Sequence, residues 1–478
     1  MMKKIILVLL CFLLWSTGVS AQDVPVKISS SETYELSNII LAITPYGKAD
    51  PWEVYKKSGY YQDVIRHFNQ YAQHPLIARV NYSREEWDKY LSFRTDAYAF
   101  EFDAENNLKR RVPFHTQEGL NPFEENLALV NDFVKVSGFR EFYSHHKPYY
   151  DSLTVAYQQS QKLPEMLSFL TREFGAEWMS ADYAIVFSPL VYRMNCHRKV
   201  NGVATDFITL PEFVLNKTAQ QHVSEEQFAS GLHMLFTEMD HGFVNPVSYK
   251  YRKKILKHFD NKKWDSGSGY AEQDPLAPFN EYMTWAVYDL FLHEHFPQVA
   301  QQVSQNWAMQ NETRGFYASA LFHAKLKELY ENRKKGQTVK DLYPALLKWC
   351  GKIQHGLTQP VIAGSQQHNA EATESTRVKY EVVFSEPMVE LDSFDVIQIA
   401  EKQPVVRNRV IITKEKNSLR WRDGGSKLYF ELDLENGYKN HIFFNAPWAT
   451  QTALKSKKGV HLVPNKSTIV TNVQVNKL

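Results

Sequence analysis

The sequence predicts a multi-domain chain, in which a mainly helical α+β part is followed by an all-β sandwich. Up to about residue 364, apolar residues recur at helical spacing, and aromatic residues make up 14% of the chain, enough to fill a large core. Beyond residue 377 the pattern changes to short alternating segments. Between the two, residues 365–377 are polar and poor in aromatic side chains, which is typical of a linker. We therefore expect a helix-rich domain at 22–364, a linker at 365–377 and a β-sandwich at 378–478.

Individual elements follow from the same periodicities. Expected helices cover Glu35–Ile43, Tyr61–Tyr71, Arg84–Phe93, Asn121–Ser137, Leu163–Phe174 and Gly315–Glu331, beside two helices discussed below. Strands are expected in the first domain at Asp182–Leu190 and Thr205–Leu210. In the second domain they are expected at Val378–Phe384, Asp395–Ile399, Arg407–Ile412, Ser418–Arg422, Lys427–Leu434, His441–Phe444 and Thr468–Val475.

The N-terminus has the pattern of a secretory signal peptide at residues 1–21. Two lysines precede an apolar run from Ile5 to Trp15, and small residues favour cleavage after Ala21. Loss of Lys3 and Lys4 leaves the basic side chains equal in number to the 53 acidic ones, so nothing indicates a nucleic-acid partner. We expect a secreted or periplasmic protein without a transmembrane segment, and whether Cys196 and Cys350 form a disulfide stays open.

A degenerate metal-binding motif is the most informative feature of the chain. The pattern H-E-x-x-H places two zinc-binding imidazoles one helical turn apart, with a glutamate beside them as general base. Here the sequence reads Thr237-Glu238-Met239-Asp240-His241, so threonine stands where the first histidine would be. A capping box at Ser224 predicts the helix start, and Gly242 and Pro246 are expected to end the helix. A solvated helix face that happens to carry Glu238 and His241 explains the same pattern.

Two downstream carboxylates complete the candidate site. Glu281 lies forty residues after His241 near the start of another expected helix, at 278–292, and is a candidate third metal ligand. A helix dipole favours a carboxylate at that position too, which is the simpler explanation. Asp289 is a candidate second-shell partner that would orient His241. Tyr282 and Tyr317 are candidates for stabilising an oxyanion, and His197, His293 and His295 are histidines that the fold could bring to the site.

Several segments resemble a family of secreted bacterial domains of unknown function, classed as similar to gluzincin zinc metallopeptidases. The similarity lies in 35–46, 60–68, 74–75, 182–190 and 314–317, and in the run from Glu238 to Pro246 followed by Asn280 and Glu281. It implies a zincin-like fold for the first domain and zinc as the cofactor, with Thr237 as the one departure from the motif. Phe384-Ser-Glu-Pro-Met388 resembles the opening of bacterial immunoglobulin-like domains, which implies that fold for the β-sandwich.

The threonine bears directly on activity. A catalytic zinc site uses three protein ligands and leaves one position for water, and a neutral hydroxyl is a poor substitute for imidazole. Without the metal, Glu238 has no activated water to deprotonate. His233 cannot help, because about 12 Å along the helix axis separates it from His241. We therefore expect zinc to be lost or weakly bound.

Three functions are compatible with these observations. The first is a metallopeptidase-like protein that has lost catalysis and binds a peptide or protein. The second is an active zinc peptidase with Glu238 as general base, His241 and Glu281 as ligands and one ligand unidentified. The third is a non-catalytic structural or interaction protein of the cell envelope. The oligomeric state is not predicted.

Overall fold

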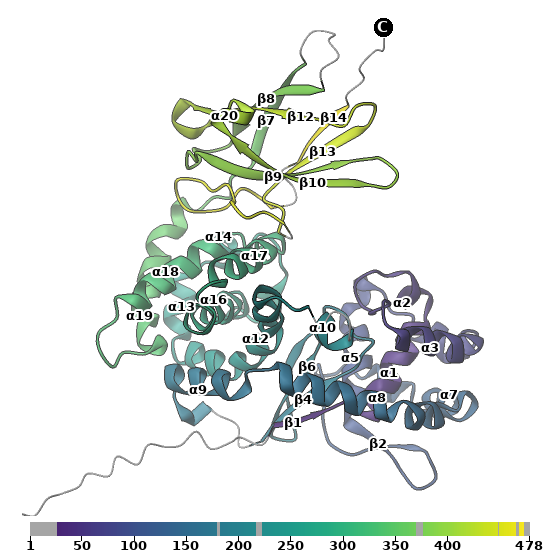
Figure 1. Ribbon diagram of the computed structural model, residues 1–478. Coiled ribbons are helices and arrows are strands. Elements are labelled where there is room, and N and C mark those ends of the chain that lie inside the picture. The colour runs from purple at the N-terminus through teal and green to yellow at the C-terminus, as the bar shows by residue number, and fades with distance from the viewer. Residues whose placement is uncertain are drawn as a thin grey trace, which may run out of the picture.

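The computed structural model describes residues 26–178, 182–216, 222–369, 376–447, 449–464 and 468–472. The predicted signal peptide and its cleavage site lie outside these residues. The described chain is a multi-domain α+β structure, with one mixed sheet between two groups of helices and two further sheets at one end (Figure 1). No helix in the described residues combines the length and apolarity that a membrane span requires.

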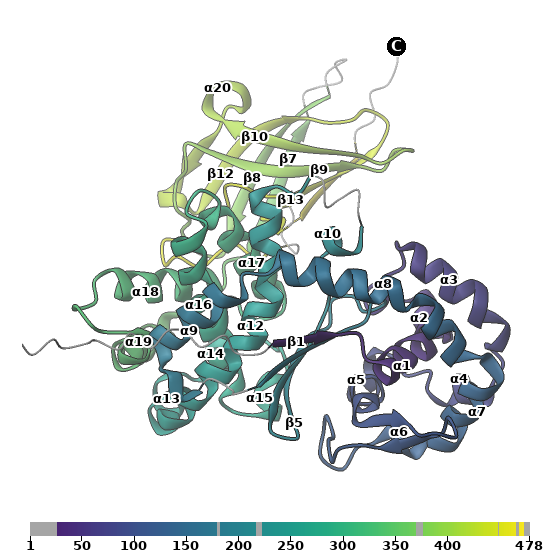
Figure 2. The same cartoon turned by 60° about the horizontal axis from the view of Figure 1, so that its bottom comes forward.

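The first group of helices covers one face of the mixed sheet. It comprises α1 (Glu32–Ile43), α2 (Pro45–Ala49), α3 (Gly59–Phe68), α4 (Pro75–Arg79), α5 (Trp87–Asp96), α6 (Pro122–Glu125), α7 (Leu127–Ser137) and the start of α8 (Phe139–Ser160), with a small hairpin of β2 (Phe100–Phe102) and β3 (Leu108–Arg110). Its core includes the fully buried α1 residues Ile39, Ile40 and Leu41. Figure 2 shows these helices on the opposite side of the sheet from α12 and α16.

The mixed sheet has the strand order β1-β4-β6-β5. Strands β1 (Val26–Ser29), β4 (Tyr183–Phe187) and β6 (Val203–Ile208) are parallel, whereas β5 (Cys196–Val200) is antiparallel to β6 and forms an edge. Side chains alternate along a strand, so the two faces of the sheet contribute to different cores. Val186 and Phe207 pack into the core of the first group of helices, whereas Ile185 and Ile208 pack into the core of the second group, described next. The predicted strands at 182–190 and 205–210 are confirmed as β4 and β6.

The second group of helices carries the candidate site. It comprises α9 (Leu163–Phe174), α10 (Glu212–Leu215), α12 (Glu225–Lys250), α13 (Arg252–His258), α14 (Asn261–Trp264), α15 (Tyr270–Gln273), α16 (Ala277–His295), α17 (Ala300–Thr313), α18 (Ser319–Glu331) and α19 (Val339–Ile353). Helix α12 packs against α16 and α9 and against strands β5 and β6. It therefore lies along the edge of the mixed sheet.

The predicted end of the central helix is wrong. Gly242 and Pro246 both lie inside α12, which continues to Lys250. A proline removes only its own backbone donor, and tertiary packing can hold the helix on both sides of it. Here Phe243, Val244 and Val247 are buried in the core around Pro246, so burial of this turn outweighs the lost hydrogen bond.

Two four-stranded antiparallel sheets form the C-terminal part. One has the order β10-β9-β13-β14 and the other β11-β12-β8-β7. The strands are β7 (Ile362–Asn369), β8 (Arg377–Phe384), β9 (Ser393–Ala400), β10 (Val406–Thr413), β11 (Arg420–Arg422), β12 (Lys427–Asp433), β13 (Lys439–Phe444) and β14 (Thr468–Asn472), with the short helix α20 (Lys414–Asn417) after β10. The sheets pack face to face, because Phe394 and Phe444 of one contact Phe430 of the other.

The predicted linker at 365–377 is partly a strand. Its first residues belong to β7, which pairs with β8 over most of its length. Polar residues such as Gln366 can occupy an edge strand because only one side of it is paired. The C-terminal part also contacts the helices: the Gln302 and Gln305 side chains of α17 donate to the Thr450 carbonyl. His461 Nδ1 lies 3.0 Å from Glu312 Oε2, and both side chains are buried.

The two cysteines belong to different cores. Cys196 packs in the first hydrophobic cluster and Cys350 in the second, and both are buried thiols. The structure therefore contains no disulfide between them.

Candidate functional site

Helix α12 presents the motif residues as the sequence predicts. Its capping box is present: Ser224 Oγ accepts from the Gln227 backbone, and the Gln227 side chain accepts from the Ser224 backbone. Leu232, Leu235 and Met239 are buried in the core. Glu238 and His241 are only partly buried, so they lie at the border between this core and the surface.

The fold brings Glu281 to His241. Glu281 lies in the second turn of α16, which packs along α12. Its Oε1 is 3.5 Å from His241 Nε2, and both side chains are about 15% exposed. The other ring nitrogen of His241, Nδ1, lies 3.3 Å from Asn245 Oδ1 one turn further along α12. Asn245, which sequence reasoning did not assign, is thus the neighbour that orients this imidazole.

The Thr237 side chain is bonded within its own helix. Its hydroxyl donates to the His233 carbonyl at 2.9 Å, one turn back along the helix, and the residue is buried. This bond satisfies a buried hydroxyl locally, as threonines inside helices commonly do. The hydroxyl at the position where the motif would have its first histidine is therefore used within the helix.

Glu238 has the properties of a proton acceptor near neutral pH. Burial raises the pKa of its carboxyl to about 7, and the nearby Glu281 charge raises it further. His241, Arg198 and a hydrogen bond from the His197 backbone act in the opposite direction. Glu238 lies beside His241 and Glu281, as the motif predicts.

A hydrogen-bonded group of three side chains next to the motif, His197, Asp206 and Tyr183, was not predicted. His197 on β5 has its Nδ1 2.7 Å from Asp206 Oδ1 on β6, and the Tyr183 hydroxyl donates to the other oxygen of Asp206. The His197 ring lies against α12 at Gly242, where a Cβ would be 4.0 Å from its Cε1. Burial, followed by the effect of His241, lowers the pKa of His197 to about 3, so this imidazole is neutral. Sequence alone indicated only that His197 was among the histidines that could reach the site.

The candidate tyrosines have other roles. The hydroxyls of Tyr282 and Tyr317 donate to the backbone carbonyls of Trp264 and Lys263. Tyr270 on α15 is the tyrosine near the carboxylates: after burial, Glu281 is the largest cause that raises its pKa, to about 12. Arg314 donates to its hydroxyl at 2.7 Å.

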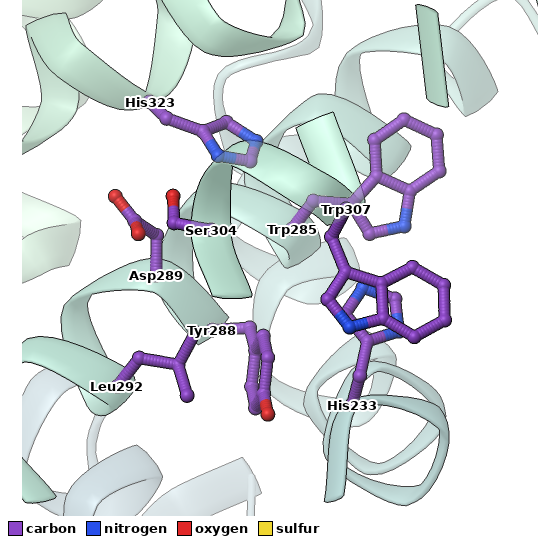
Figure 3. A pocket seen from close by; sticks show the side chains of 8 residues that line it. All are labelled: His233, Trp285, Tyr288, Asp289, Leu292, Ser304, Trp307 and His323. Atoms are coloured by element: carbon purple, nitrogen blue, oxygen red, sulfur yellow. The ribbon is translucent and has the colours of Figure 1, made fainter. Parts of the chain in front are cut away.

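Asp289 lies in a different cluster. Its Oδ1 is 3.7 Å from His293 Nε2, one turn away on α16. Figure 3 shows Asp289 together with His233, Ser304, Trp307 and His323 around a small cavity between α12, α16, α17 and α18. The predicted role of Asp289 as the partner of His241 is thus taken by Asn245.

The residues of the site do not fit a three-ligand zinc centre. Within the described residues, no group of three His, Cys, Asp or Glu side chains is arranged to hold a metal ion. His241 and Glu281 are adjacent, but Thr237 is bonded elsewhere. His295 pairs with Glu294, and His293 contacts Asp289 and Lys327, so neither of them supplies a further ligand.

Comparison with known proteins gives little further information. No family model matches the chain, and no curated protein matches it. Three solved structures of the bacterial surface-layer protein SbsC, one of them comprising domains 1–6, align with 51–67% of this chain at 9–10% identity. The chain spans 33–58% of the length of those chains, and the TM-score of 0.17 is too low to indicate a shared fold.

Proposed function

We propose that this chain is an exported, metallopeptidase-like protein with a degenerate metal site, and that it binds peptides without cleaving them. The observation that carries the proposal is the Thr237 hydroxyl, which is bonded to the His233 carbonyl and leaves only His241 and Glu281 beside the base Glu238. Two protein ligands are fewer than a catalytic zinc site uses. In this proposal the first domain is zincin-like and the C-terminal sheets are an immunoglobulin-like module.

The edge strand β5 supports peptide binding. Within the described residues, β5 pairs with β6 on one side only, and α12 with the candidate site packs along the same two strands. An unpaired strand edge can add an extended chain through backbone hydrogen bonds. A peptide paired with β5 would pass the Glu238 and His241 side chains.

A second candidate is an active peptidase with an unconventional ligand set. His197 favours it, because this imidazole lies against α12 beside His241 and its Nδ1 is held by Asp206. A carboxylate in this position is the usual partner of a metal-binding histidine. In this alternative His197 would have to move to complete a ligand set with His241 and Glu281, because the described side chains do not form one, and Glu238 would be the base.

One experiment separates binding from cleavage. Residues 22–478 are incubated with a fluorescein-labelled extended peptide of about ten residues, with and without added zinc. Anisotropy reports binding and mass spectrometry reports cleavage. We expect saturable binding that does not need zinc, with the peptide intact. Zinc-dependent cleavage that is abolished by both Glu238→Gln and His197→Gln would favour the second candidate, and absence of binding would contradict the first.

A further inference from the structure

An exposed arginine lies close to two aromatic rings just before the edge strand β5. The Arg193 guanidinium is 4.2 Å from the centre of the Trp52 ring and 5.1 Å from that of Tyr192. Trp52 is 41% exposed, which is unusual for so large an apolar side chain. We call Trp52, Tyr192 and Arg193 the aromatic platform.

Backbone hydrogen bonds hold the platform in place. Its two loops are joined by a bridge between Val54 and Val191 and by the bond from the Tyr55 amide to the Leu190 carbonyl, at 2.8 Å. The Tyr192 amide donates to the Glu53 carbonyl at 3.3 Å. In one loop, Asp50 Oδ1 accepts from the Trp52 amide at 2.7 Å. The rings are therefore presented by a braced pair of loops.

The backbone of Arg193 is in the left-handed region, with φ of 56°. A residue with a Cβ is strained there, and such strain is retained where the surrounding structure or a function requires it. Glycine would adopt this conformation freely. The chain nevertheless has arginine at this turn, and its side chain covers the two rings.

The chemistry of Arg193 points to an anionic ligand. In the part of the chain that the structure describes, no carboxylate forms an ion pair with Arg193. Stacking on aromatic faces orients the planar guanidinium while its edge keeps several N–H donors free. That edge matches a carboxylate, which can accept two parallel hydrogen bonds.

We propose that the aromatic platform binds a carboxylate side chain of the extended peptide that pairs with β5. Arg193 lies three positions before Cys196, the first residue of β5, so the platform stands close to one end of this edge strand. This inference rests on the proposed peptide binding, and adds that the preferred peptide is acidic near the end that meets the platform.

The test uses two amidated, N-acetylated peptides of identical extended sequence, one with a glutamate and one with a glutamine near one end. Binding to residues 22–478 is measured by fluorescence anisotropy. We expect the glutamate peptide to bind at least about tenfold more tightly than the glutamine peptide. The glutamine side chain cannot form the charge-assisted hydrogen bonds with Arg193. The preference should weaken as salt concentration rises. A third peptide, with glutamine and a free C-terminal carboxylate, tells a side-chain carboxylate from a chain end.

Variants of the platform make the test specific. Arg193→Gly removes the side chain while relieving the strained φ, so its fold is retained and the preference for glutamate should disappear. Arg193→Lys keeps the positive charge but lacks the planar guanidinium that can donate two parallel hydrogen bonds. It should retain only part of the preference for glutamate over glutamine. Arg79→Ala, at an exposed arginine on α4, is the matched control and should bind like the wild type.

The outcomes separate this inference from the proposed function. If both peptides bind equally and Arg193→Gly does not change their affinities, the platform does not recognise a carboxylate, although the proposed peptide binding is still supported. If neither peptide binds, the proposed function and this inference fail together.

Discussion

His241 Nε2 lies 3.5 Å from Glu281 Oε1, so two residues forty positions apart meet across the contact between α12 and α16. In an H-E-x-x-H site, a histidine and a distant glutamate at this spacing would share a metal ion. Here they contact each other, and the third position is occupied by a threonine that is bonded within its own helix. The fold therefore brings together the two predicted ligands, His241 and Glu281, and the Thr237 hydroxyl is bonded elsewhere.

Gly242→Ala should stabilise the protein. A Cβ at Gly242 would meet only His197 Cε1, at the ordinary contact distance of 4.0 Å, and alanine is favoured over glycine inside a helix. We expect the free energy of unfolding to rise by about 0.5–1 kcal/mol in urea denaturation. Gly231→Ala in the same helix is the matched control, because its Cβ would come within 2.7 Å of Phe213 Cε1 and should destabilise the protein. Equal effects of the two substitutions would contradict the packing described for α12.

Acid should destabilise the helical core through His233 and His323. Both are 4% exposed, none of their four ring nitrogens has a hydrogen-bond partner, and burial lowers the pKa of each. A group with a lowered pKa in the folded state binds its proton only on unfolding, so stability is lost as pH falls below the unfolded pKa of about 6.5. Each histidine should lower the free energy of unfolding by about 1.4 kcal/mol when the pH falls from 7.5 to 5.5.

The measurement is urea unfolding of the wild type and of the double variant His233→Gln/His323→Gln at both pH values. The double variant should lose less stability on acidification than the wild type. His145→Gln, at an exposed histidine of α8, should leave the loss unchanged. The same pH dependence in all three proteins would show that the buried pair does not titrate on unfolding.

The buried contact between Glu312 and His461 should couple the helices to the C-terminal sheets. Glu312 Oε2 is 3.0 Å from His461 Nδ1, and Oε1 accepts from the Ala320 amide. In a double-mutant cycle of Glu312→Gln and His461→Ala, we expect a coupling energy of about 1–3 kcal/mol, because each single variant leaves a buried group without its partner. If the two substitutions have additive effects on the free energy of unfolding, the contact does not couple the helices to the C-terminal sheets. The matched exposed pair Lys147 and Asp151 should show a coupling below about 1 kcal/mol.

Local patterns predicted many of the elements but few of the spatial relations. The Ser224 capping box and the helix at Leu163–Phe174 are confirmed, because their signals lie within a few adjacent residues. The long helix α8 was missed: it contains Pro148 and many polar residues, and its buried side chains, such as Tyr150 and Leu153, are widely spaced. Pro246 misled the prediction for α12 for the same reason.

The candidate site was predicted in part. Glu281 could be found because the motif sets the chemistry and a second helix supplies a carboxylate. Asn245 lies one turn from His241 on α12 itself, so helical spacing could have indicated it. His197 and Asp206 depend on which strand lies beside α12, and the strand order β1-β4-β6-β5 cannot be derived from spacing along the chain. Asp289 was predicted to be the partner of His241 because it lies on the same helix as Glu281. In the structure it contacts His293 instead.

The metal content of residues 22–478 after zinc loading and desalting tests the central claim most directly. Wild type is measured beside Thr237→His and the double variant Thr237→His/Glu281→Gln. A degenerate site predicts that wild type retains no zinc, that Thr237→His holds about one equivalent, and that the double variant loses it again. If wild type itself holds about one equivalent and Glu281→Gln or His197→Gln releases it, the site is intact and the account of a lost metal centre is wrong.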